Sequence, residues 1–477
     1  MKGALTQLQR ELGDAVLVGK ADCLAASMDS ARLSFPPQAV VRIKSEEQVG
    51  MVLKLANRCG APVTARGGGT ATTGAASPVR GGWVLDFRGW NDIRIDATAG
   101  MAYVRPGATI AAIQQAAKRY GWFYPPDPSS LHYATIGGAI ATNAGGLRAA
   151  RYGVTRDYVY ALEGFLPSGE RVRWGMDVKK FASGYNIRDL WIGSEGTLGI
   201  VTSAVLKLIP APVARQTFLA VFNDEGMALR AVQALLKTRL VPAVLEFLDR
   251  QTVACTLQRC GALPLLDDTT GALLLIEVDG STDNVRAQSV TVKTWATKHT
   301  QKWRAAHSPA EGERLWSIRR QCSPAMFALG DTKLNEDVVV PLRSQVALLQ
   351  FTEQLNGDLG LPTPTFGHAA DGNFHVHLMF DWRNQEQRKQ AERGVQALME
   401  AVVTLGGAIT GEHGIGLAKS PFLRLQHNAA EIAAMQAIKH ALDPNNILNP
   451  GKLFEPFAIW QHEPARVRFP WERGTRS

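Results

Sequence analysis

In the stretch ARGGGTATTG at residues 65–74, three consecutive glycines directly follow a strand signal, PVTAR at 62–66. Glycines allow backbone N–H groups to approach an anion closely, as a phosphate-binding loop requires. The spacing departs from the Rossmann dinucleotide fingerprint, since Thr72 stands where the third glycine belongs, and no P-loop is present. A single loop of this kind is equally compatible with a structural turn.

Three further loops in the same half of the chain favour a cofactor site. They are rich in glycine, proline and small residues: PPDPSS at 125–130, TIGGAIATNAGG at 135–146 and GSEGTLG at 193–199. Several backbone cradles suit a long cofactor with a pyrophosphate better than a single phosphate.

Strand and helix signals alternate through the first half. A strand at 38–43 precedes Ser45, which is placed to cap a helix with one apolar stripe. Pro210 and Pro212 indicate a domain boundary, and the following region has the pattern of an α+β domain.

Composition describes an ordinary globular protein with a formal net charge of +9 over 477 residues. Five cysteines form neither an even disulfide framework nor a CxxC pair, so reduced thiols in the cytoplasm are expected. No signal peptide or membrane-spanning run is evident. The basic charge is concentrated only in the C-terminal tail, which is predicted to be solvated. The alternative is a docking segment, either for the inner face of a membrane or for an electron-accepting partner. The tail residues are Arg466, Arg468, Arg473 and Arg476 among Trp460, Phe469 and Trp471.

Together the glycine loops resemble those of the vanillyl-alcohol oxidase and p-cresol methylhydroxylase flavoproteins, over residues 35–210 and the C-terminal LNPGKLF. The resemblance implies an α+β fold. A two-part FAD-binding domain of the vanillyl-alcohol oxidase type (1–212) is completed by a C-terminal segment with a basic tail (421–477). Between them lies an α+β substrate and metal-binding cap domain with an antiparallel sheet (213–420).

The same resemblance implies non-covalent FAD, because no His or Cys stands at 66–76. Ala71 occupies a position where relatives usually have another glycine. The implied FAD-binding residues are Arg66, Gly67, Gly68, Gly69, Thr70, Pro126, Asp127, Ser129, Gly137, Gly138, Thr142, Asn143, Gly145, Gly193, Glu195, Gly196, Gly199, Ile200 and Asn449.

Two motifs in the second half are typical of a metal site. In GHAADGNFHVHLMF (367–380) the strand period places His375 and His377 on one face, and the preceding turn allows His368 to join them. GEHGIG (411–416) adds Glu412. Two histidines and one carboxylate can bind a divalent metal with open positions, although a packed polar turn is the alternative.

These two motifs resemble the D-lactate, glycolate and D-2-hydroxyglutarate dehydrogenase branch of the same family. The match implies that His368, His375 and Glu412 bind the metal, with Zn²⁺ or Mn²⁺ favoured and Fe²⁺ left open. It also makes His413 the catalytic base. Ala370 replaces a family glycine, and His377 is assigned to substrate or to the metal shell.

The helix signal RLWSIRRQCSPAM (314–326) places Arg319 and Ser323 on one face with Trp316. Arginine suits bidentate binding of a carboxylate, although a surface helix is the alternative. In the family a Trp-x-x-Arg helix carries the carboxylate-binding arginine, and a lysine matching Lys333 acts beside it. Arg320 is predicted to face outward.

The resemblance implies FAD-dependent oxidation of a small anionic D-2-hydroxy acid to the 2-oxo acid. The C2 hydride passes to flavin N5, while a divalent metal and His413 activate the hydroxyl. A quinone, an electron-transfer flavoprotein or a partner subunit takes the electrons; a homodimer and no nucleic-acid partner are expected. Two alternatives are a flavin-dependent transferase of the alkylglycerone-phosphate synthase type and a non-catalytic FAD-binding subunit.

Overall fold

The computed structural model describes residues 2–261, 265–267, 269–467 and 469–470, in two compact units. The first unit comprises residues 2–146, 153–211 and 412–470. The second comprises residues 147–152 and 212–411. Of the basic tail, Arg468, Trp471, Arg473 and Arg476 lie outside the described residues.

A four-stranded sheet in the order β1-β2-β4-β3 opens the first unit, and β2, β4 and β3 run parallel. Helix α3 (Glu46–Cys59) follows β2 and is capped by the Ser45 side chain, as predicted. Its apolar stripe of Val49, Val52, Leu53 and Ala56 is fully buried. Helix α1 (Lys2–Leu12) packs on α3. The strands are β1 (Val16–Leu17), β2 (Ala39–Arg42), β3 (Val63–Arg66) and β4 (Trp83–Asp86).

A five-stranded antiparallel sheet in the order β5-β6-β10-β8-β9 completes the first unit. Helices α4 (Ile110–Lys118) and α5 (Ile136–Thr142) share an apolar core with one face of this sheet. The strands are β5 (Ile93–Asp96), β6 (Met101–Val104), β8 (Val159–Phe165), β9 (Arg171–Gly175) and β10 (Ile200–Lys207).

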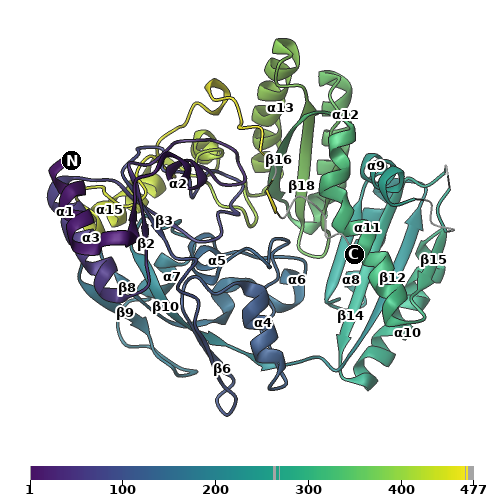
Figure 1. The fold of residues 1–477 in the computed structure, drawn as a ribbon. Helices are drawn as coiled ribbons and strands as arrows, with labels where there is room; N and C mark the ends of the chain where they lie inside the picture. The colour runs from purple at the N-terminus through teal and green to yellow at the C-terminus, as the bar shows by residue number, and fades with distance from the viewer. Residues whose placement is uncertain (1, 262–264, 268, 468, 471–477) are drawn as a thin grey trace. The chain divides into compact units, whose positions relative to one another are not determined.

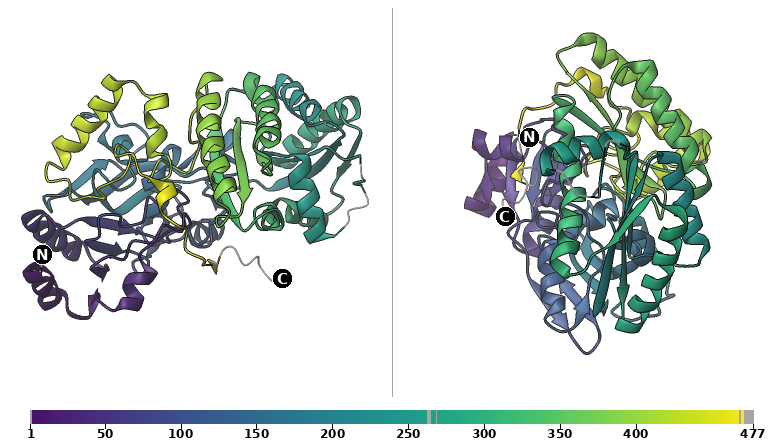
Figure 2. Two further views of the ribbon diagram at one scale, coloured as in Figure 1. Left: turned by 90° about the horizontal axis from the view of Figure 1, so that it is seen from above. Right: turned by 90° about the vertical axis from the view of Figure 1, so that its right-hand side faces the viewer.

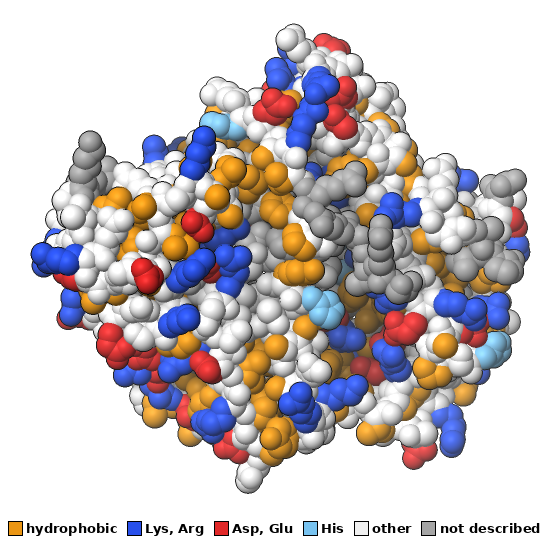
Figure 3. Space-filling model, in the orientation of Figure 1, with side chains coloured by type: hydrophobic (Ala, Val, Ile, Leu, Met, Phe, Trp, Pro, Cys, Tyr) orange, Lys and Arg blue, Asp and Glu red, His pale blue; other side chains and the backbone are white. Residues whose placement is uncertain are grey.

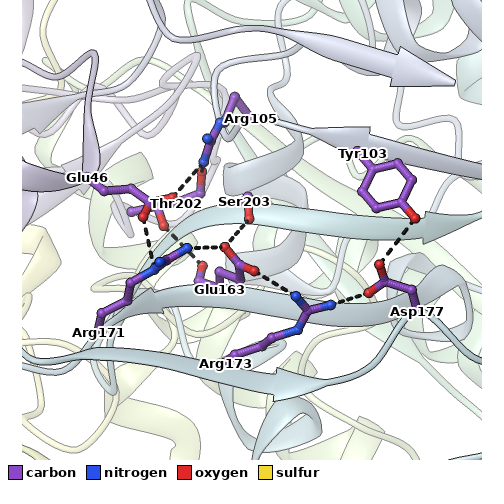
Figure 4. Close-up of polar contacts among 9 residues, drawn as sticks. All are labelled: Glu46, Tyr103, Arg105, Glu163, Arg171, Arg173, Asp177, Thr202 and Ser203. Carbon is purple, nitrogen blue, oxygen red and sulfur yellow. Dashed lines mark hydrogen bonds and ion pairs between the residues drawn. The ribbon is translucent and has the colours of Figure 1, made fainter.

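An ion-pair network covers the opposite face of the five-stranded sheet (Figure 4). Glu163 binds Arg171 at 2.7 Å and Arg173 at 2.9 Å. Glu46 at the start of α3 binds Arg171 and Arg105, each at 2.9 Å. The network therefore fastens α3 to this sheet.

The C-terminal segment returns to the first unit beside β3. The Val63 amide donates to the Ile447 carbonyl at 2.7 Å, and the Asn449 amide donates to the Val63 carbonyl at 2.8 Å. Lys439, near the end of α15 (Ala429–Leu442), donates to the Thr197 carbonyl at 2.9 Å. The remaining short elements are α2 (Lys20–Ala25), β7 (Trp122–Phe123), α6 (Ala149–Tyr152), α7 (Ile187–Trp191), β11 (Ile209–Pro210), α14 (Leu423–Gln426) and α15 (Ala429–Leu442).

The second unit is built on a seven-stranded antiparallel sheet in the order β15-β12-β14-β13-β17-β18-β16 (Figures 1 and 2). Every neighbouring pair of these strands is antiparallel. The strands are β12 (Ala214–Phe222), β13 (Val244–Leu248), β14 (Ala272–Gly280), β15 (Lys302–Ala305), β16 (Thr332–Val339), β17 (Thr365–His368) and β18 (Asn373–Phe380).

Helices cover both faces of this sheet. Helices α8 (Glu225–Lys237), α10 (Thr282–His299), α12 (Gln345–Leu359) and α13 (Gln385–Thr404) pack together on one face. Helices α9 (Arg250–Cys260) and α11 (Pro309–Ala325) pack on the other, where Leu315 and Trp316 share a core with Leu219 and Leu275.

The α+β fold with its antiparallel cap sheet is confirmed, but the unit boundaries differ from the predicted ones. The return to the first unit begins at Glu412 instead of 421, because residues 415–418 bond to Glu195 and Thr73. Residues 147–152 join the second unit, where the Tyr152 hydroxyl donates to Asp279 at 2.7 Å.

Surface charge is mixed, as the sequence indicated. Figure 3 shows Lys and Arg side chains interspersed with Asp and Glu over the face in view. None of the described helices combines the length and the apolar character that spanning a bilayer requires. The five cysteines are free thiols.

Candidate active site

One face of the seven-stranded sheet, the face covered by α9 and α11, carries a row of polar side chains. Antiparallel register brings them onto the same face, since directly paired residues point the same way. Asp337 pairs with His375, His368 pairs with Asn373 and also with Glu246. We call this row the polar sheet face: Glu246, Lys333, Asn335, Asp337, His368, Asn373, His375 and His377.

His368 and His375 are brought together on the polar sheet face. Their rings are perpendicular, with centroids 5.4 Å apart, and both side chains are buried. A ligand nitrogen of each lies within 4.8 Å of the other, and a carboxylate oxygen of Asp337 lies within 4.8 Å of a His375 nitrogen. His377 is also on this face, with Nδ1 3.1 Å from the Pro364 carbonyl and its ring stacked on Phe366. Within the second unit, His368 and His375 form a pair of ligands that is chemically suited to a divalent metal.

Glu246 links His368 to Arg319. Glu246 Oε1 lies 2.5 Å from His368 Nδ1, and Glu246 Oε2 accepts a hydrogen bond from Arg319 Nε at 2.5 Å. Burial alone would raise the pKa of Glu246, but the charges and hydrogen bonds of His368 and Arg319 outweigh burial and lower the pKa to about 2. Glu246 is therefore an ionised carboxylate inside the protein. Sequence analysis did not identify it.

Helix α11 places its predicted face against the polar sheet face. The Trp316 indole donates to buried Glu277 at 2.9 Å, and the Arg319 guanidinium lies 4.4 Å from the centre of the Phe366 ring. One turn further on, the Ser323 hydroxyl accepts a hydrogen bond from Lys333 Nζ at 2.6 Å. Arg319, Ser323 and Lys333 thus line up along the same face. Arg320 points outward and pairs with exposed Glu313, as predicted.

Asp337 fixes the segment that leads to the GEHGIG motif. Its Oδ2 accepts hydrogen bonds from the Gly411 amide at 2.8 Å and from the Thr410 hydroxyl at 2.9 Å. Its Oδ1 accepts one from Asn373 Nδ2 at 2.6 Å. Glu412 is the next residue along the chain, about 3.8 Å from Gly411 between Cα atoms. Asp337, which the sequence analysis also missed, therefore anchors the start of this motif beside His375.

In the first unit, Glu412 and His413 lie among the glycine loops. A Cβ atom on Gly145 would be 2.9 Å from Glu412 Oε2, so the Glu412 carboxylate lies against the backbone of the TNAGG loop. The His413 carbonyl accepts a hydrogen bond from the Thr73 hydroxyl at 3.3 Å. Gly416 has a left-handed φ of 52°, and a Cβ there would be 2.4 Å from the Thr73 carbonyl oxygen. The motif therefore needs glycine to pack on residues 66–76.

Two of the four loops predicted to share a cofactor, TIGGAIATNAGG and GSEGTLG, are hydrogen-bonded to each other, and Asn449 joins GSEGTLG to Ala75, which follows the 65–74 loop. The Gly193 and Glu195 amides donate to the Ile140 and Ala141 carbonyls of α5, at 2.9 and 2.7 Å. The Asn449 side-chain amide donates to the Ala75 and Glu195 carbonyls, at 2.9 and 2.8 Å. The other residues implied for FAD lie in the same loops or at the ends of adjoining elements: Gly67, Gly68, Gly69, Thr70, Pro126, Asp127, Ser129, Gly137, Gly138, Thr142, Asn143, Gly145, Gly196, Gly199 and Ile200.

The residues present fit a bound pyrophosphate. Gly68 approaches the Tyr133 carbonyl so closely that a Cβ would be 2.1 Å from its oxygen. This position therefore requires glycine, and no side chain covers the backbone there. Arg66 is buried at the end of β3, and burial lowers the pKa of its guanidinium. Within the described chain, Arg66 Nη1, Thr72 Oγ1 and Ser77 Oγ are buried polar atoms with no hydrogen-bond partner. Such donors are costly to bury unless a polar ligand satisfies them.

The Glu195 carboxylate is hydrogen-bonded to the backbone of the GEHGIG motif. It accepts hydrogen bonds from the Ile415 amide at 2.6 Å and the Gly416 amide at 2.8 Å. It thereby joins the GSEGTLG loop to the GEHGIG motif. Burial nevertheless raises the pKa of Glu195 to about 7.

We expect Glu195→Gln to change how stability depends on pH. Between pH 4.5 and 7, Glu195 stays protonated in the folded protein and ionises in the unfolded chain, so the folded state binds more protons. The proton that Glu195 binds in the folded state therefore stabilises the protein at low pH, and this contribution to the free energy of unfolding is lost as the pH rises. Across that window, the wild type should lose roughly 2 to 3 kcal/mol relative to the variant, which cannot titrate there. Urea unfolding at both ends of the window measures this, and parallel pH curves would contradict it.

Two family models match the chain: an FAD binding domain over residues 37–175, and FAD linked oxidases, C-terminal domain, over residues 211–453. Glycolate oxidase subunit GlcD of Bacillus subtilis is 38% identical over 421 residues, covering 88% of this chain and 89% of that protein. D-lactate dehydrogenase of Anaerostipes hadrus is 35% identical over 431 residues, covering 87% and 89%.

Solved structures show the same fold. The structure of p-cresol methylhydroxylase has a TM-score of 0.80 with 19% identity, covering 95% of this chain and 97% of that one. Alkyldihydroxyacetonephosphate synthase has a TM-score of 0.73, also with 19% identity, covering 94% and 86%. At that identity, the likeness shows the fold alone. With the family models and the relatives above, the chain belongs to the FAD-linked oxidases of the vanillyl-alcohol oxidase and p-cresol methylhydroxylase flavoprotein family, in the branch of glycolate oxidase subunit GlcD and D-lactate dehydrogenase.

Proposed function

We propose that this protein oxidises a small D-2-hydroxy acid to the corresponding 2-oxo acid, using non-covalent FAD and a divalent metal. The observation that carries the proposal is the polar sheet face, where the buried pair His368 and His375 lies beside a mostly buried arginine, Arg319, and Glu246 joins Arg319 to His368. The chain's relatives named glycolate oxidase subunit and D-lactate dehydrogenase support the same substrate class.

Arg319 is the proposed anchor for the substrate carboxylate. Its guanidinium is mostly buried, with 12% of the side chain exposed, and is fixed between Glu246 and the Phe366 ring. A planar fork held in this way suits bidentate binding of a carboxylate. Lys333 and Ser323, hydrogen-bonded to each other on the same side of the sheet, add a second cation and a hydroxyl. His377 is proposed to contact the substrate as well.

His368, His375 and Glu412 are the proposed metal ligands. The two histidines meet in the second unit, and Glu412 directly follows Gly411, which Asp337 binds. Mixed nitrogen and oxygen ligands are compatible with Zn²⁺ or Mn²⁺. A divalent ion, when bound, supplies positive charge that lowers the pKa of an alcohol.

His413 is the proposed general base. His413 directly follows Glu412, and the backbone of this motif is fixed by hydrogen bonds from Thr73 and to Glu195. The position of His413 relative to Glu412, a proposed metal ligand, is therefore set by the chain itself. In this role His413 accepts the proton of the C2 hydroxyl. FAD, when bound, supplies the acceptor for the C2 hydride. A quinone, an electron-transfer flavoprotein or a partner subunit is proposed to take the electrons onward.

Two alternatives have less support. A flavin-dependent transferase would resemble the alkyldihydroxyacetonephosphate synthase structure, but that likeness extends to the fold alone. A non-catalytic FAD-binding subunit leaves the buried Glu246–His368–Arg319 arrangement without a use. Anaerobic mixing of the flavoprotein with D- and L-2-hydroxy acids separates the proposed function from both alternatives, because only the proposed function predicts bleaching of the flavin absorbance.

Removing the metal should slow this bleaching. We expect a chelator to lower the rate of flavin reduction at least about tenfold, because the positive charge that acidifies the hydroxyl is lost. Added Zn²⁺ or Mn²⁺ should restore the rate, while the absorbance of the bound oxidised flavin stays unchanged throughout. An undiminished rate in protein shown to be free of metal would contradict the metal part of the proposal.

A further inference from the structure

Glu246 is a charged residue in an otherwise apolar strand. Strand β13 has the sequence VLEFL, and all five side chains are buried, Glu246 with 0% exposure. A carboxylate is almost never fully buried unless it is paired, because desolvating the charge is costly. The contacts that Glu246 makes should therefore explain its presence.

The Oε1 atom of Glu246 determines which nitrogen of His368 can bind a metal. Glu246 Oε1 lies 2.5 Å from His368 Nδ1, so the carboxylate occupies this side of the ring. When His368 binds a metal, Nδ1–H donates to Glu246 and Nε2 supplies the lone pair to the metal. Metal-binding histidines commonly donate their other ring N–H to a carboxylate, which fixes the tautomer and the ring orientation and makes the ligand nitrogen more basic.

The Oε2 atom of Glu246 determines the orientation of Arg319. It accepts the Nε–H of Arg319 at 2.5 Å, while the guanidinium lies over the Phe366 ring. A guanidinium fixed at Nε and stacked on a ring keeps its plane, so the position of its remaining donors is set before any substrate arrives. One buried carboxylate thus contacts both a proposed metal ligand and the proposed substrate anchor.

We propose that Glu246 is a positioning residue that holds His368 and Arg319 in their binding geometries at the same time. Glu246 itself touches neither metal nor substrate in this account. Its removal should weaken metal binding and substrate binding together, although the two ligands bind to different residues. The inference rests on the proposed function, in which His368 binds a metal and Arg319 binds a carboxylate.

Glu277 offers a matched control on the neighbouring strand. It is 3% exposed, pairs with Val244 of β13 and lies on the same face of the sheet. Its Oε2 accepts hydrogen bonds from the Trp316 indole at 2.9 Å and from the Thr217 hydroxyl at 3.3 Å. Glu277→Gln therefore removes a similarly buried carboxylate beside the same helix without removing a group that binds His368 or Arg319.

The test compares wild type, Glu246→Gln, Glu246→Asp and Glu277→Gln as purified flavoproteins, with flavin content and thermal unfolding confirming the fold. Metal affinity is measured by titrating Zn²⁺ and Mn²⁺ against a competing chelator. KM is measured for flavin reduction by the best D-2-hydroxy acid at saturating metal. Glu246→Gln should lower metal affinity about 10–100-fold and raise KM by about tenfold. Glu277→Gln should leave both within about twofold, as expected for a residue outside the binding groups.

Glu246→Asp keeps the charge but is one methylene shorter, so it keeps the test decisive if Glu246→Gln does not fold. A folded Glu246→Asp should also lose metal affinity, because the carboxylate no longer reaches His368. Unchanged metal affinity in a folded Glu246 variant overturns the inference, as does weaker metal binding with an unchanged KM. A wild type that neither binds metal nor is reduced by D-2-hydroxy acids overturns the proposed function instead.

Discussion

His413→Ala is expected to slow flavin reduction by a D-2-hydroxy acid by about 10²–10⁴-fold, the usual contribution of a positioned general base. The C2 hydroxyl must lose its proton as the hydride leaves, and His413 is the proposed acceptor. The His413 backbone is fixed through Thr73 and through the Glu195 bonds to Ile415 and Gly416, so the substitution should leave the motif folded. Single-turnover reduction under anaerobic conditions measures the effect.

His427→Ala is the control for this prediction. His427 lies 3.2 Å from Glu431 on the surface of the first unit and has no proposed role in the reaction. Its replacement should leave flavin reduction unchanged.

The pH dependence of His413→Ala gives a second test. Its rate of flavin reduction should fall further at low pH and rise when the solution supplies stronger bases, as expected when the internal base is missing. A near-wild-type rate in His413→Ala would show that the assigned base is wrong.

Arg319→Met is expected to damage both activity and stability. The substrate carboxylate loses its anchor, so KM should rise about 10–100-fold, the value of a hydrogen-bonded charge pair. Glu246, with 0% of its side chain exposed, loses its 2.5 Å ion-pair partner. Breaking a buried ion pair from one side costs about 3 to 5 kcal/mol. Here the buried carboxylate keeps its contact with His368 but loses the guanidinium. Flavin-reduction kinetics and urea unfolding measure the two effects separately.

A double variant and a surface control separate these contributions. Arg319→Met with Glu246→Gln removes the stranded charge, so it should recover part of the lost stability while KM stays high. Arg320→Met removes an arginine one position along α11 that pairs at the surface with Glu313, and it should change the free energy of unfolding by about 0 to 1 kcal/mol. Equal effects at the two arginines would contradict the assignment of Arg319.

Local sequence patterns were sufficient to predict one part of the candidate site. The two-residue period of β18 put His375 and His377 on one face, and the register confirms this. The helical period likewise put Trp316, Arg319 and Ser323 on one face and Arg320 on the outer one, and the contacts of α11 agree. These predictions succeed because the direction of a side chain follows from the period of its own strand or helix.

Glu246 and Asp337 were missed because their meaning depends on distant partners. Glu246 is 122 positions from His368 and 73 from Arg319, and Asp337 is 74 from Gly411. A local pattern carries no information about such pairs. The available signal was an acidic residue within an apolar strand, VLEFL, since a buried carboxylate needs a partner. The unit boundary at Glu412 was missed for the same reason, because it follows from bonds between residues 415–416 and Glu195.

In the proposed reaction, a D-2-hydroxy acid reduces the FAD of this protein. The most direct test is anaerobic flavin bleaching by matched D and L enantiomers of glycerate-sized to glutarate-sized 2-hydroxy acids, with glycolate as the achiral member. We expect bleaching by at least one D enantiomer or by glycolate, little bleaching by the matching L enantiomers, and formation of one molecule of 2-oxo acid per flavin reduced. An oxidised flavin that persists with every one of these acids, or equal bleaching by D and L forms, would contradict the proposed reaction.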